Sequence, residues 1–393
     1  MDVRKFVSPF GQLVTISGHD PRYGEDYALK AFVPADLPET MLLEPSTYAA
    51  VERASMAVAR ADQAARQLPN AGLLARPAIR REAVSTSALE GTFAALRDVL
   101  EADLLDDDDD LTRPSGAVSE VLNFVRAAEQ AFAWVRERPI TLGMLEDLQG
   151  ILVRGTRADT SDAGRLRTCV VAIGADQRRL YDARFIPPPP GDLLRDGVTS
   201  WVEWINRPSG TPLLVKIAAA HYQFEALHPF NDGNGRIGRL VAILQLIRSE
   251  VLSVPIVNLS PWFETRRDEY QDQLLQVSHT GKFDPWIEFF CEAVRHQANE
   301  ATEKVRRLVE VRDGMRAQLR DVRARGVSIQ IADELIGYPM ITATRAARRH
   351  QVTYQAANQG IARLTDLGIL RELTGRKYGR MFVCDPVMAI IES

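Results

Sequence analysis

The densest group of chemically useful residues runs from His228 to Arg239 and reads HPFNDGNGRIGR. Gly233 and Gly235 allow the backbone to turn tightly and to approach a ligand without interference from a Cβ atom. If a helix begins at that turn, its free N–H groups and its positive dipole end form an anion site. Arg236 and Arg239 are three residues apart, so both guanidinium groups lie on one helix face and can bind phosphate oxygens in bidentate fashion.

Two further side chains of this segment supply complementary chemistry. Asp232 is a hard oxygen ligand beside the anion site, as expected for Mg²⁺ that is shared with phosphate groups. His228 lies just outside the turn and can accept a proton from an attacking hydroxyl group. The G-x-x-x-x-G-K-[ST] pattern is absent, and the element expected before the turn is a helix, which excludes a Walker loop and a Rossmann turn.

The segment matches every fixed position of the signature H-x-F-x-[DE]-G-N-G-R-x-x-R, and it therefore resembles the Fic family, whose competent members transfer AMP from ATP to protein hydroxyl groups. The resemblance implies that His228 is the general base and that Asp232 holds Mg²⁺ on the α- and β-phosphates of ATP. It also implies that the loop and the following helix contact the nucleotide. The implied nucleotide-binding set is Gly233, Asn234, Gly235, Arg236, Ile237, Gly238, Arg239 and Tyr270.

Within this set the resemblance assigns different groups to different parts of ATP. The backbone N–H groups of residues 233–235, with the Asn234 side chain, would bind the α-phosphate. Arg236 and Arg239 would neutralise the β- and γ-phosphates and the leaving pyrophosphate. The segment SPWFETRRDEYQDQL resembles the family's aromatic base-pocket region, so Tyr270 would line that pocket; a buried structural tyrosine is the alternative.

A second motif lies more than a hundred residues before the first. The segment TSALEG, Thr86 to Gly91, matches the family's inhibitory pattern [ST]-x-x-x-E-[GN]. If this helix end packs beside the phosphate site, Glu90 pairs with Arg239 and keeps the γ-phosphate away. Some family members also remove AMP with this glutamate and a metal-bound water, so de-AMPylation stays open as an alternative.

Residues 165–190 differ from the helical segments around them. They contain two short β-rich runs about a Gly-Ala-Asp turn and end in four consecutive prolines, which no helix can contain. The segment resembles the β-hairpin flap that family members lay over the target protein. An exposed edge of the hairpin at 165–186 could bind the target as an added strand and so place its hydroxyl group over the phosphate.

Helical periodicity dominates the chain between about 45 and 323. We expect a mainly α fold: a Fic-type helical bundle with a β-hairpin flap and a C-terminal winged helix-turn-helix module. Residues 1–45 are rich in Pro and Gly, and we interpret them as an N-terminal arm of short irregular pieces. The expected domains are residues 1–110, with the arm, the first helices and the inhibitory helix; residues 111–300, the Fic catalytic core; and residues 301–393, a linker helix with the winged-helix module.

The C-terminal module is predicted from three short helical segments followed by a β-hairpin. Residues 326–393 carry eight basic and six acidic residues. Arg348 and Arg349 precede the expected recognition helix, and Arg376, Lys377 and Arg380 lie at the expected wing, where a winged helix contacts phosphates. The charge excess is small, so protein–protein contact or dimerisation is as good an interpretation as DNA binding.

Composition limits the remaining classes. The 393 residues carry a net charge of −4, so no net basic field indicates a nucleic-acid partner, and residues 106–110 form an acidic run that we interpret as a solvated loop. Three scattered cysteines predict no disulfide framework and no zinc site. The sequence contains no signal peptide or membrane span, so we expect a cytoplasmic protein without a membrane partner.

Taken together, these patterns predict a protein adenylyltransferase that uses Mg-ATP, modifies Ser, Thr or Tyr hydroxyls of proteins including itself, and is inhibited by Glu90. The family resemblance also suggests a homodimer. One alternative is a Fic-fold transferase of another group, such as a different nucleotide, a phosphate or phosphocholine. From another class, the alternative is a winged-helix DNA-binding regulator whose Fic-like body senses a nucleotide.

Overall fold

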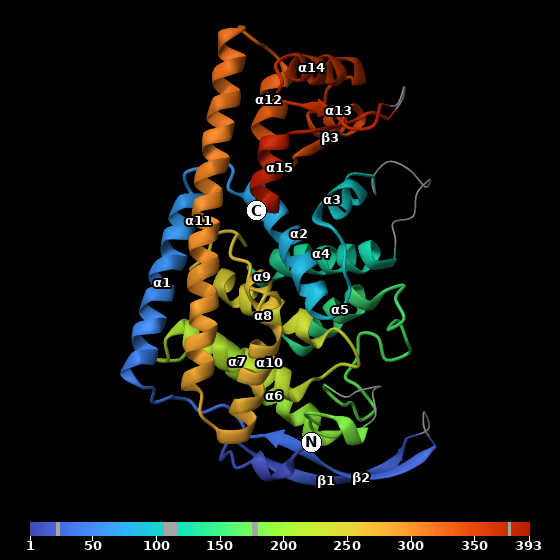
Figure 1. The fold of residues 1–393 in the computed structure, drawn as a ribbon, viewed down its shortest axis with the longest axis vertical. Helices are drawn as coiled ribbons and strands as arrows, with labels where there is room; N and C mark the ends of the chain where they lie inside the picture. Colours follow the sequence, from blue (N-terminus) through green and yellow to red (C-terminus); the bar gives the residue numbers. More distant parts are fainter. Residues whose placement is uncertain (21–23, 106–115, 175–179, 376–378) are drawn as a thin grey trace.

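The computed structural model describes residues 1–20, 24–105, 116–174, 180–375 and 379–393. The molecule is elongated and mainly helical, with a β-hairpin at one end and a small mixed module at the other (Figure 1). None of the helices in the described ranges is long and apolar enough to cross a membrane. The expected mainly α fold is confirmed, and the functional motif lies inside the helical body.

The helical body is centred on two consecutive helices, α7 (Leu213–Leu227) and α8 (Asn234–Arg248). Nearly every residue of both helices is buried, because neighbouring helices cover them on all sides. The helices around this pair are α4 (Gly116–Val135), α5 (Leu142–Val153), α6 (Asp192–Asn206), α9 (Ser260–Glu264) and α10 (Arg267–Thr280).

Two long helices lie side by side along the body, α1 (Pro45–Ala65) and α11 (Asp284–Asp321) (Figure 1). Alanines at α-helical spacing form the fully buried face of α1, which permits close helix–helix approach: Ala54, Ala57, Ala61 and Ala65. The expected domain boundary at 300/301 falls inside α11, which continues from the body into the C-terminal module. The boundary at 110/111 and the acidic run at 106–110 lie outside the described residues.

The N-terminal segment is a β-hairpin, so the prediction of an irregular arm is wrong. Strands β1 (Gly11–Asp20) and β2 (Glu25–Pro34) pair antiparallel along their full length, after a short 3-10 turn at Val3–Lys5. The hairpin supports the segment predicted to be the flap, because the Phe32 N–H donates to the Ile186 carbonyl at 2.9 Å. A small apolar cluster closes this contact: Ile16, Ala31, Ala183 and Ile186.

The C-terminal module contains the three helices and the hairpin strands that the sequence predicts. These are α12 (Val327–Glu334), α13 (Ala343–Arg349), α14 (Tyr354–Asp366), β4 (Arg371–Glu372) and β5 (Met381–Val383). Two elements were not predicted, strand β3 (Met340–Thr342), which pairs with β5 to give the order β3-β5-β4, and helix α15 (Asp385–Glu392). The assignment of the whole C-terminal module as a winged helix stays a prediction. Arg376 and Lys377 of the expected wing lie outside the described residues.

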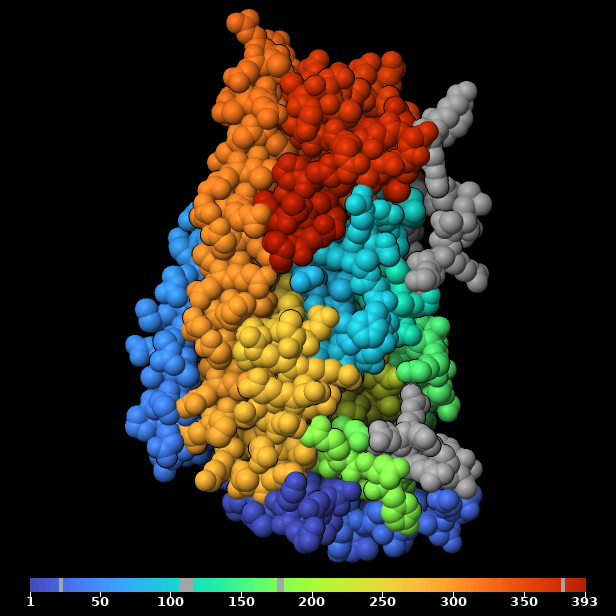
Figure 2. All heavy atoms as spheres, in the orientation of Figure 1, coloured from blue at the N-terminus to red at the C-terminus, as the bar shows by residue number. Residues whose placement is uncertain are grey.

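The C-terminal module packs directly on the body. Its apolar residues belong to the same continuous core as those of the helical bundle, and α15 contacts both α11 and α2 (Gly72–Leu89). Figure 2 shows the module seated between α11 and the segment that contains α2 and α3 (Leu96–Leu105). Helix α2 therefore connects two regions: its first turns face the module, and its last turn reaches the functional motif.

Candidate active site

The loop between α7 and α8 is held in an unusual backbone conformation. His228 caps α7 with φ 48°, in the left-handed region that few non-glycine residues adopt. Gly233 caps α8 with φ 84°, and a Cβ atom there would lie 2.6 Å from the Leu152 side chain. The Asn234 amide closes the loop, because its Nδ2 donates to the Phe230 carbonyl at 2.7 Å and its Oδ1 accepts from the Phe230 N–H at 2.8 Å.

These contacts place the start of α8 toward the pocket. The first N–H groups of an α-helix have no intrahelical acceptor, so those at Asn234, Gly235 and Arg236 are available to an anion. The Asn234 side chain, which we predicted to bind the α-phosphate, is instead hydrogen bonded within the loop. Ile237 is fully buried in the core, so only its backbone can serve a ligand.

The two arginines of the motif have different partners. Arg236 is 5% exposed and donates from Nη2 to Asp232 Oδ1 at 2.6 Å. Arg239 is 2% exposed and donates from Nη2 to Glu90 Oε1 at 2.6 Å. Arg239 also donates from Nε to the Thr86 hydroxyl at 2.8 Å and from Nη2 to the Thr86 carbonyl at 3.2 Å. The last turn of α2 thus supplies three hydrogen-bond acceptors to the Arg239 guanidinium group.

Glycine at position 235 makes room for this ion pair. A Cβ atom at Gly235 would lie 2.2 Å from Glu90 Oε1 and 2.8 Å from Arg239 Nη1, distances at which both groups would have to move. Gly91 ends α2 with φ 89°, as the motif predicts, and turns the chain away directly after Glu90. The carboxylate therefore lies directly over the start of α8, where we predicted the phosphates of ATP.

Charge distribution in the site follows from burial and from this ion pair. Burial opposes ionisation of Glu90, but the adjacent Arg239 outweighs it and holds the pKa of Glu90 below its usual value. Burial and the nearby Arg167 guanidinium lower the pKa of His228 to about 4. The imidazole is therefore neutral near pH 7, which is the form that can accept a proton.

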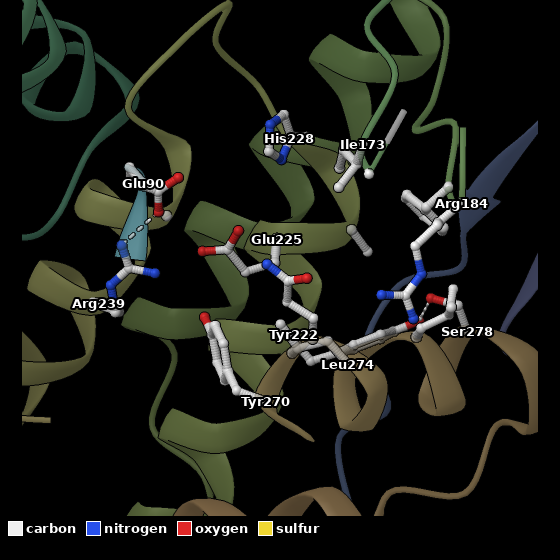
Figure 3. Close-up of a pocket in the computed structure, with 16 residues that line it drawn as sticks. Glu90, Ile173, Arg184, Tyr222, Glu225, His228, Arg239, Tyr270, Leu274 and Ser278 are labelled. Atoms are coloured by element: carbon white, nitrogen blue, oxygen red, sulfur yellow. Dashed lines mark hydrogen bonds and ion pairs between the residues drawn. The ribbon is translucent and has the colours of Figure 1, made fainter. Parts of the chain in front are cut away.

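An open pocket extends from this ion pair across α7 and α10. Figure 3 shows Glu90 and Arg239 at one end, Arg184 and Ser278 at the other, and Glu225, Tyr222 and Tyr270 between them. His228 lies at the rim that faces the flap. The lining combines charged and apolar side chains, and its apolar members include Ile173, Phe185, Leu274 and Leu275.

Tyr270 lies in the pocket wall. Two titratable residues near it, His221 and Glu225, were not selected as site residues from the sequence. Its hydroxyl is 2.7 Å from His221 Nε2, and its ring stacks on Phe263 at 4.5 Å between centroids. His221 is therefore a buried, hydrogen-bonded residue of the core. Glu225, one turn after His221, was missed because a glutamate near a helix end is an ordinary surface residue in most sequences.

The predicted flap is present in reduced form. The described part of the segment 165–186 contains one antiparallel bridge, Ile173 with Phe185, and all but Gly174 of the expected Gly-Ala-Asp turn at 174–176 lies outside the described residues. Arg184 forms an ion pair with Asp272, which joins this segment to α10. Two short β-rich runs were predicted; beyond Phe185 four consecutive prolines, which have no N–H to donate, prevent the pairing from continuing among the described residues.

Arg167 fixes the flap to the motif loop, and the sequence analysis missed it. Its buried guanidinium group donates to the carbonyls of His228 at 2.8 Å, Cys169 at 3.0 Å and Pro188 at 2.5 Å. Its own N–H donates to the Pro229 carbonyl at 2.9 Å. Burial lowers the pKa of Arg167 to about 10, so it remains charged near neutral pH.

The predicted metal ligand, Asp232, has a side chain that is 35% exposed. The described part of the chain contains no cluster of three or more His, Cys, Asp or Glu side chains that could hold a metal ion alone. Mg²⁺ suits such a site, because it binds through one or two carboxylates together with phosphate oxygens and retained waters. The donor set present therefore fits a metal that arrives with a nucleotide.

Sequence comparison places the motif in a known family context. The family described as Fic/DOC family N-terminal matches residues 48–133, and the Fic/DOC family itself matches residues 139–246. The protein adenylyltransferase fic-1 of Caenorhabditis elegans is 34% identical over 137 residues, which is 34% of this chain and 24% of that protein. The protein adenylyltransferase Fic of Aedes aegypti is 36% identical over 124 residues, 30% of this chain and 23% of that protein.

The matches to curated relatives are partial, since this chain spans about a quarter of the length of the first of them. Among solved structures, a Fic family protein from Desulfovibrio desulfuricans has a TM-score of 0.55 at 19% identity and covers 88% of this chain and 98% of its own. Fic-1 of Caenorhabditis elegans, residues 134–508, has a TM-score of 0.50 at 20% identity and covers 66% of this chain and 73% of its own. These two likenesses concern the fold.

Proposed function

The chain belongs to the Fic family, and on that premise we propose that it is a protein adenylyltransferase that transfers AMP from Mg-ATP to Ser, Thr or Tyr hydroxyl groups of proteins, including itself. One observation carries the proposal: a neutral histidine, His228, stands beside the start of α8 and the buried Arg239, all on the wall of one pocket. These groups supply a base, an anion site and a cation for a triphosphate.

The proposed reaction uses each group for a separate task. His228 accepts the proton of the target hydroxyl while its oxygen forms a bond to the α-phosphorus. The bond from that phosphorus to the bridging oxygen breaks, and pyrophosphate leaves. The N–H groups at the start of α8 bind the α-phosphate, while Arg236 and Arg239 balance the charge of the β- and γ-phosphates. The Asn234 side chain contributes by holding the loop.

We assign the metal to Asp232, which would hold Mg²⁺ together with phosphate oxygens; the ion would supply charge neutralisation for the leaving pyrophosphate. Arg236 then exchanges its present contact with Asp232 for phosphate. Gly238 has a different role from the one implied by the motif. A Cβ atom there would lie 2.5 Å from Glu225 Oε1, so this glycine serves helix packing and makes room for that carboxyl group.

We also propose that the contact between Glu90 and Arg239 inhibits the enzyme. Arg239 cannot bind the γ-phosphate while Glu90 and Thr86 occupy its guanidinium group. The Glu90 carboxylate also repels a phosphate at the same place, because both are anions. ATP could then enter only in a pose that is misaligned for attack by the target hydroxyl.

The substrate side of the proposal concerns the segment 165–186. We propose that a target protein docks on its free edge, beside the pocket rim that contains His228. A homodimer and a cytoplasmic location stay predictions, as does DNA binding by the C-terminal module. Two arginines of that module already have internal partners: Arg349 pairs with Glu334, and Arg371 pairs with Asp385.

The test is incubation of the full chain with Mg²⁺ and ATP that carries its label on the α-phosphate. The proposal expects label bound covalently to protein. ATP labelled on the γ-phosphate should leave the protein unlabelled, which separates AMP transfer from phosphate transfer. Retention of duplex DNA with a steep salt dependence, and no label on protein, would favour the DNA-binding regulator instead.

A further inference from the structure

Glu225 is a second carboxyl group near Arg239 that neither the reaction nor the inhibitory contact uses. It lies on α7, its side chain is 14% exposed, and its Oε1 is buried without a hydrogen-bond partner in the described structure. Figure 3 shows its carboxyl group pointing across the pocket toward Arg239 and Glu90. Gly238 leaves the space that Oε1 fills, because a Cβ atom at that position would lie 2.5 Å from Oε1.

Among the described groups around Glu225, a single cation, Arg239, is close to two carboxyl groups, those of Glu225 and Glu90. His221 on α7 lies 4.0 Å from Glu225 Oε1, and burial lowers the pKa of His221 to about 3, so it is neutral. Tyr270 on α10 is neutral too, because burial raises its pKa. The remaining charged groups are Arg239 on α8 and Glu90 after α2. Glu90 already neutralises Arg239, so ionised Glu225 would be a surplus buried anion.

Removal of Glu90 reverses this balance. Arg239 is then a buried cation without its carboxylate, and Glu225 is the acid that faces it from within the pocket. We propose that Glu225 is a positioning residue, which ionises and holds the Arg239 guanidinium group when Glu90 has left, and which competes there with the phosphates of ATP. The inference rests on the proposed function, because it assumes that ATP places its phosphates on Arg239.

The protonation state of Glu225 depends on whether another anion, Glu90 or a phosphate, occupies Arg239. While Glu90 occupies Arg239, burial raises the pKa of Glu225 to about 8, and a phosphate on Arg239 would act in the same direction. In the absence of either anion, Arg239 lowers the pKa of Glu225. ATP binding to a protein without Glu90 therefore takes up a proton, and its affinity falls as pH rises.

The experiment measures binding of Mg²⁺ and α,β-methylene-ATP, which cannot transfer AMP, by isothermal titration calorimetry between pH 6 and 9. The protein is the full chain with Glu90→Gly, with and without Glu225→Gln; Glu269→Gln, on the exposed surface of α10, is the matched control. We expect the affinity of Glu90→Gly to fall at least fivefold over this range. The double variant with Glu225→Gln should change less than twofold and bind more tightly at pH 9.

Three outcomes would contradict the proposal or the function on which it rests. Nucleotide binding with the same pH profile in the presence and absence of Glu225 would overturn the role of Glu225 and leave the proposed function standing. No nucleotide binding by the Glu90→Gly protein at any pH would contradict the proposed function itself. A merely structural role of Glu225 would weaken binding equally at every pH, which also contradicts the proposal.

A different observation, the contact of the C-terminal module with α2, carries a second inference. The Tyr338 ring lies between two guanidinium groups, with Arg76 of α2 at 4.4 Å and Arg349 of α13 at 3.5 Å from its centroid. Gly337 packs on the α2 backbone, because a Cβ atom there would lie 2.6 Å from the Leu73 carbonyl oxygen. The Leu73 carbonyl receives no hydrogen bond from the residue four positions later in the helix, because that residue is Pro77, which has no N–H.

Further contacts join the module to α2 through α3. Arg76 forms an ion pair with Asp103 of α3, and Arg80 donates to the same carboxylate at 3.1 Å. Arg345 of the module donates to the Asp103 carbonyl at 3.0 Å. The first turns of α2 are thus fixed by the module, and the last turn of the same helix carries Glu90. We infer that the C-terminal module sets the position of the inhibitory helix and so controls the contact of Glu90 with Arg239.

The test compares the effect of disrupting the contact between Tyr338 and α2 on self-AMPylation in proteins with and without Glu90. Tyr338→Ala should raise self-AMPylation at least threefold in the chain that retains Glu90, and should change it by less than 1.5-fold in the Glu90→Gly background. Tyr354→Ala, at an exposed tyrosine of the same module, is the control. Arg76→Gln, measured with its thermal unfolding profile, replaces Tyr338→Ala if that variant does not fold. An equal effect in both backgrounds, or no effect in either, would overturn the inference.

Discussion

The Nη2 atom of Arg239 lies 2.6 Å from Oε1 of Glu90, a residue 149 positions earlier in the chain. Two motifs that look independent in the sequence therefore form one ion pair, in which Arg239 is buried and Glu90 is partly exposed to the pocket. Because Arg239 is also the arginine we assign to the phosphates of ATP, the contact explains how inhibition and catalysis can depend on the same guanidinium group.

Replacement of the inhibitory acid should activate the enzyme. Glu90→Gly removes the carboxylate from Arg239 and keeps the chain able to adopt the conformation at the end of α2. We expect self-AMPylation to rise at least tenfold, measured as labelled AMP bound per protein. Glu137→Gly, at an exposed position after α4, should leave the rate unchanged. Equal rates for Glu90→Gly and the original chain would refute inhibition by Glu90.

The pH profile of the activated enzyme should lack the usual histidine step. A general base acts in its neutral form, so activity is lost only as pH falls through the pKa of His228, which is lowered to about 4. We expect kcat of Glu90→Gly, at saturating ATP, to stay within twofold from pH 5.5 to 8. Half-maximal kcat near pH 6.5, the ordinary value for histidine, would contradict the described environment of His228.

Loss of Arg167 should destabilise the protein and loosen the flap. Arg167→Ala leaves several buried carbonyls without their donor, including that of His228, so we expect the free energy of unfolding to fall by about 2–4 kcal/mol. Urea unfolding followed by circular dichroism measures this change. Arg165→Ala, at the exposed neighbour in the same segment, is the control. A change within 0.5 kcal/mol of the control would show that these hydrogen bonds contribute little.

Metal dependence should centre on Asp232. In the Glu90→Gly background, a chelator should abolish AMP transfer, and Asp232→Ala should lower kcat at least a hundredfold, because the metal then loses its one protein carboxylate. The assay titrates Mg²⁺ at fixed ATP. Full activity of Asp232→Ala at ordinary Mg²⁺ concentration would remove Asp232 from the metal site.

The sequence predicted best what depends on neighbouring residues. The positions from His228 to Arg239 act within one loop and one helical turn, so their spacing alone indicated a phosphate site. The contact of Glu90 with Arg239 joins distant segments, and it was expected because TSALEG has a recognised place in the family pattern. The roles of these residues in transfer and inhibition stay proposals.

Features that depend on tertiary contacts were harder to predict. The N-terminal hairpin was missed because half of the β1 residues are exposed and only Ile16 and Asp20 are buried, so alternation of apolar and polar residues is weak. Glu225 and Arg167 draw their importance from burial beside other groups, which no local pattern records. Helix α15 was overlooked because it is a short segment that is stabilised by packing on α11 and α2.

The most direct test of the account compares Glu90→Gly with the double variant Glu90→Gly/His228→Ala, using ATP labelled on the α-phosphate. We predict strong labelling of the single variant, no labelling of the double variant, and similar affinity of both for α,β-methylene-ATP. That result would show that AMP transfer needs His228 after nucleotide binding. Labelling that persists in the double variant, or no labelling of either protein although both bind the nucleotide, would contradict it.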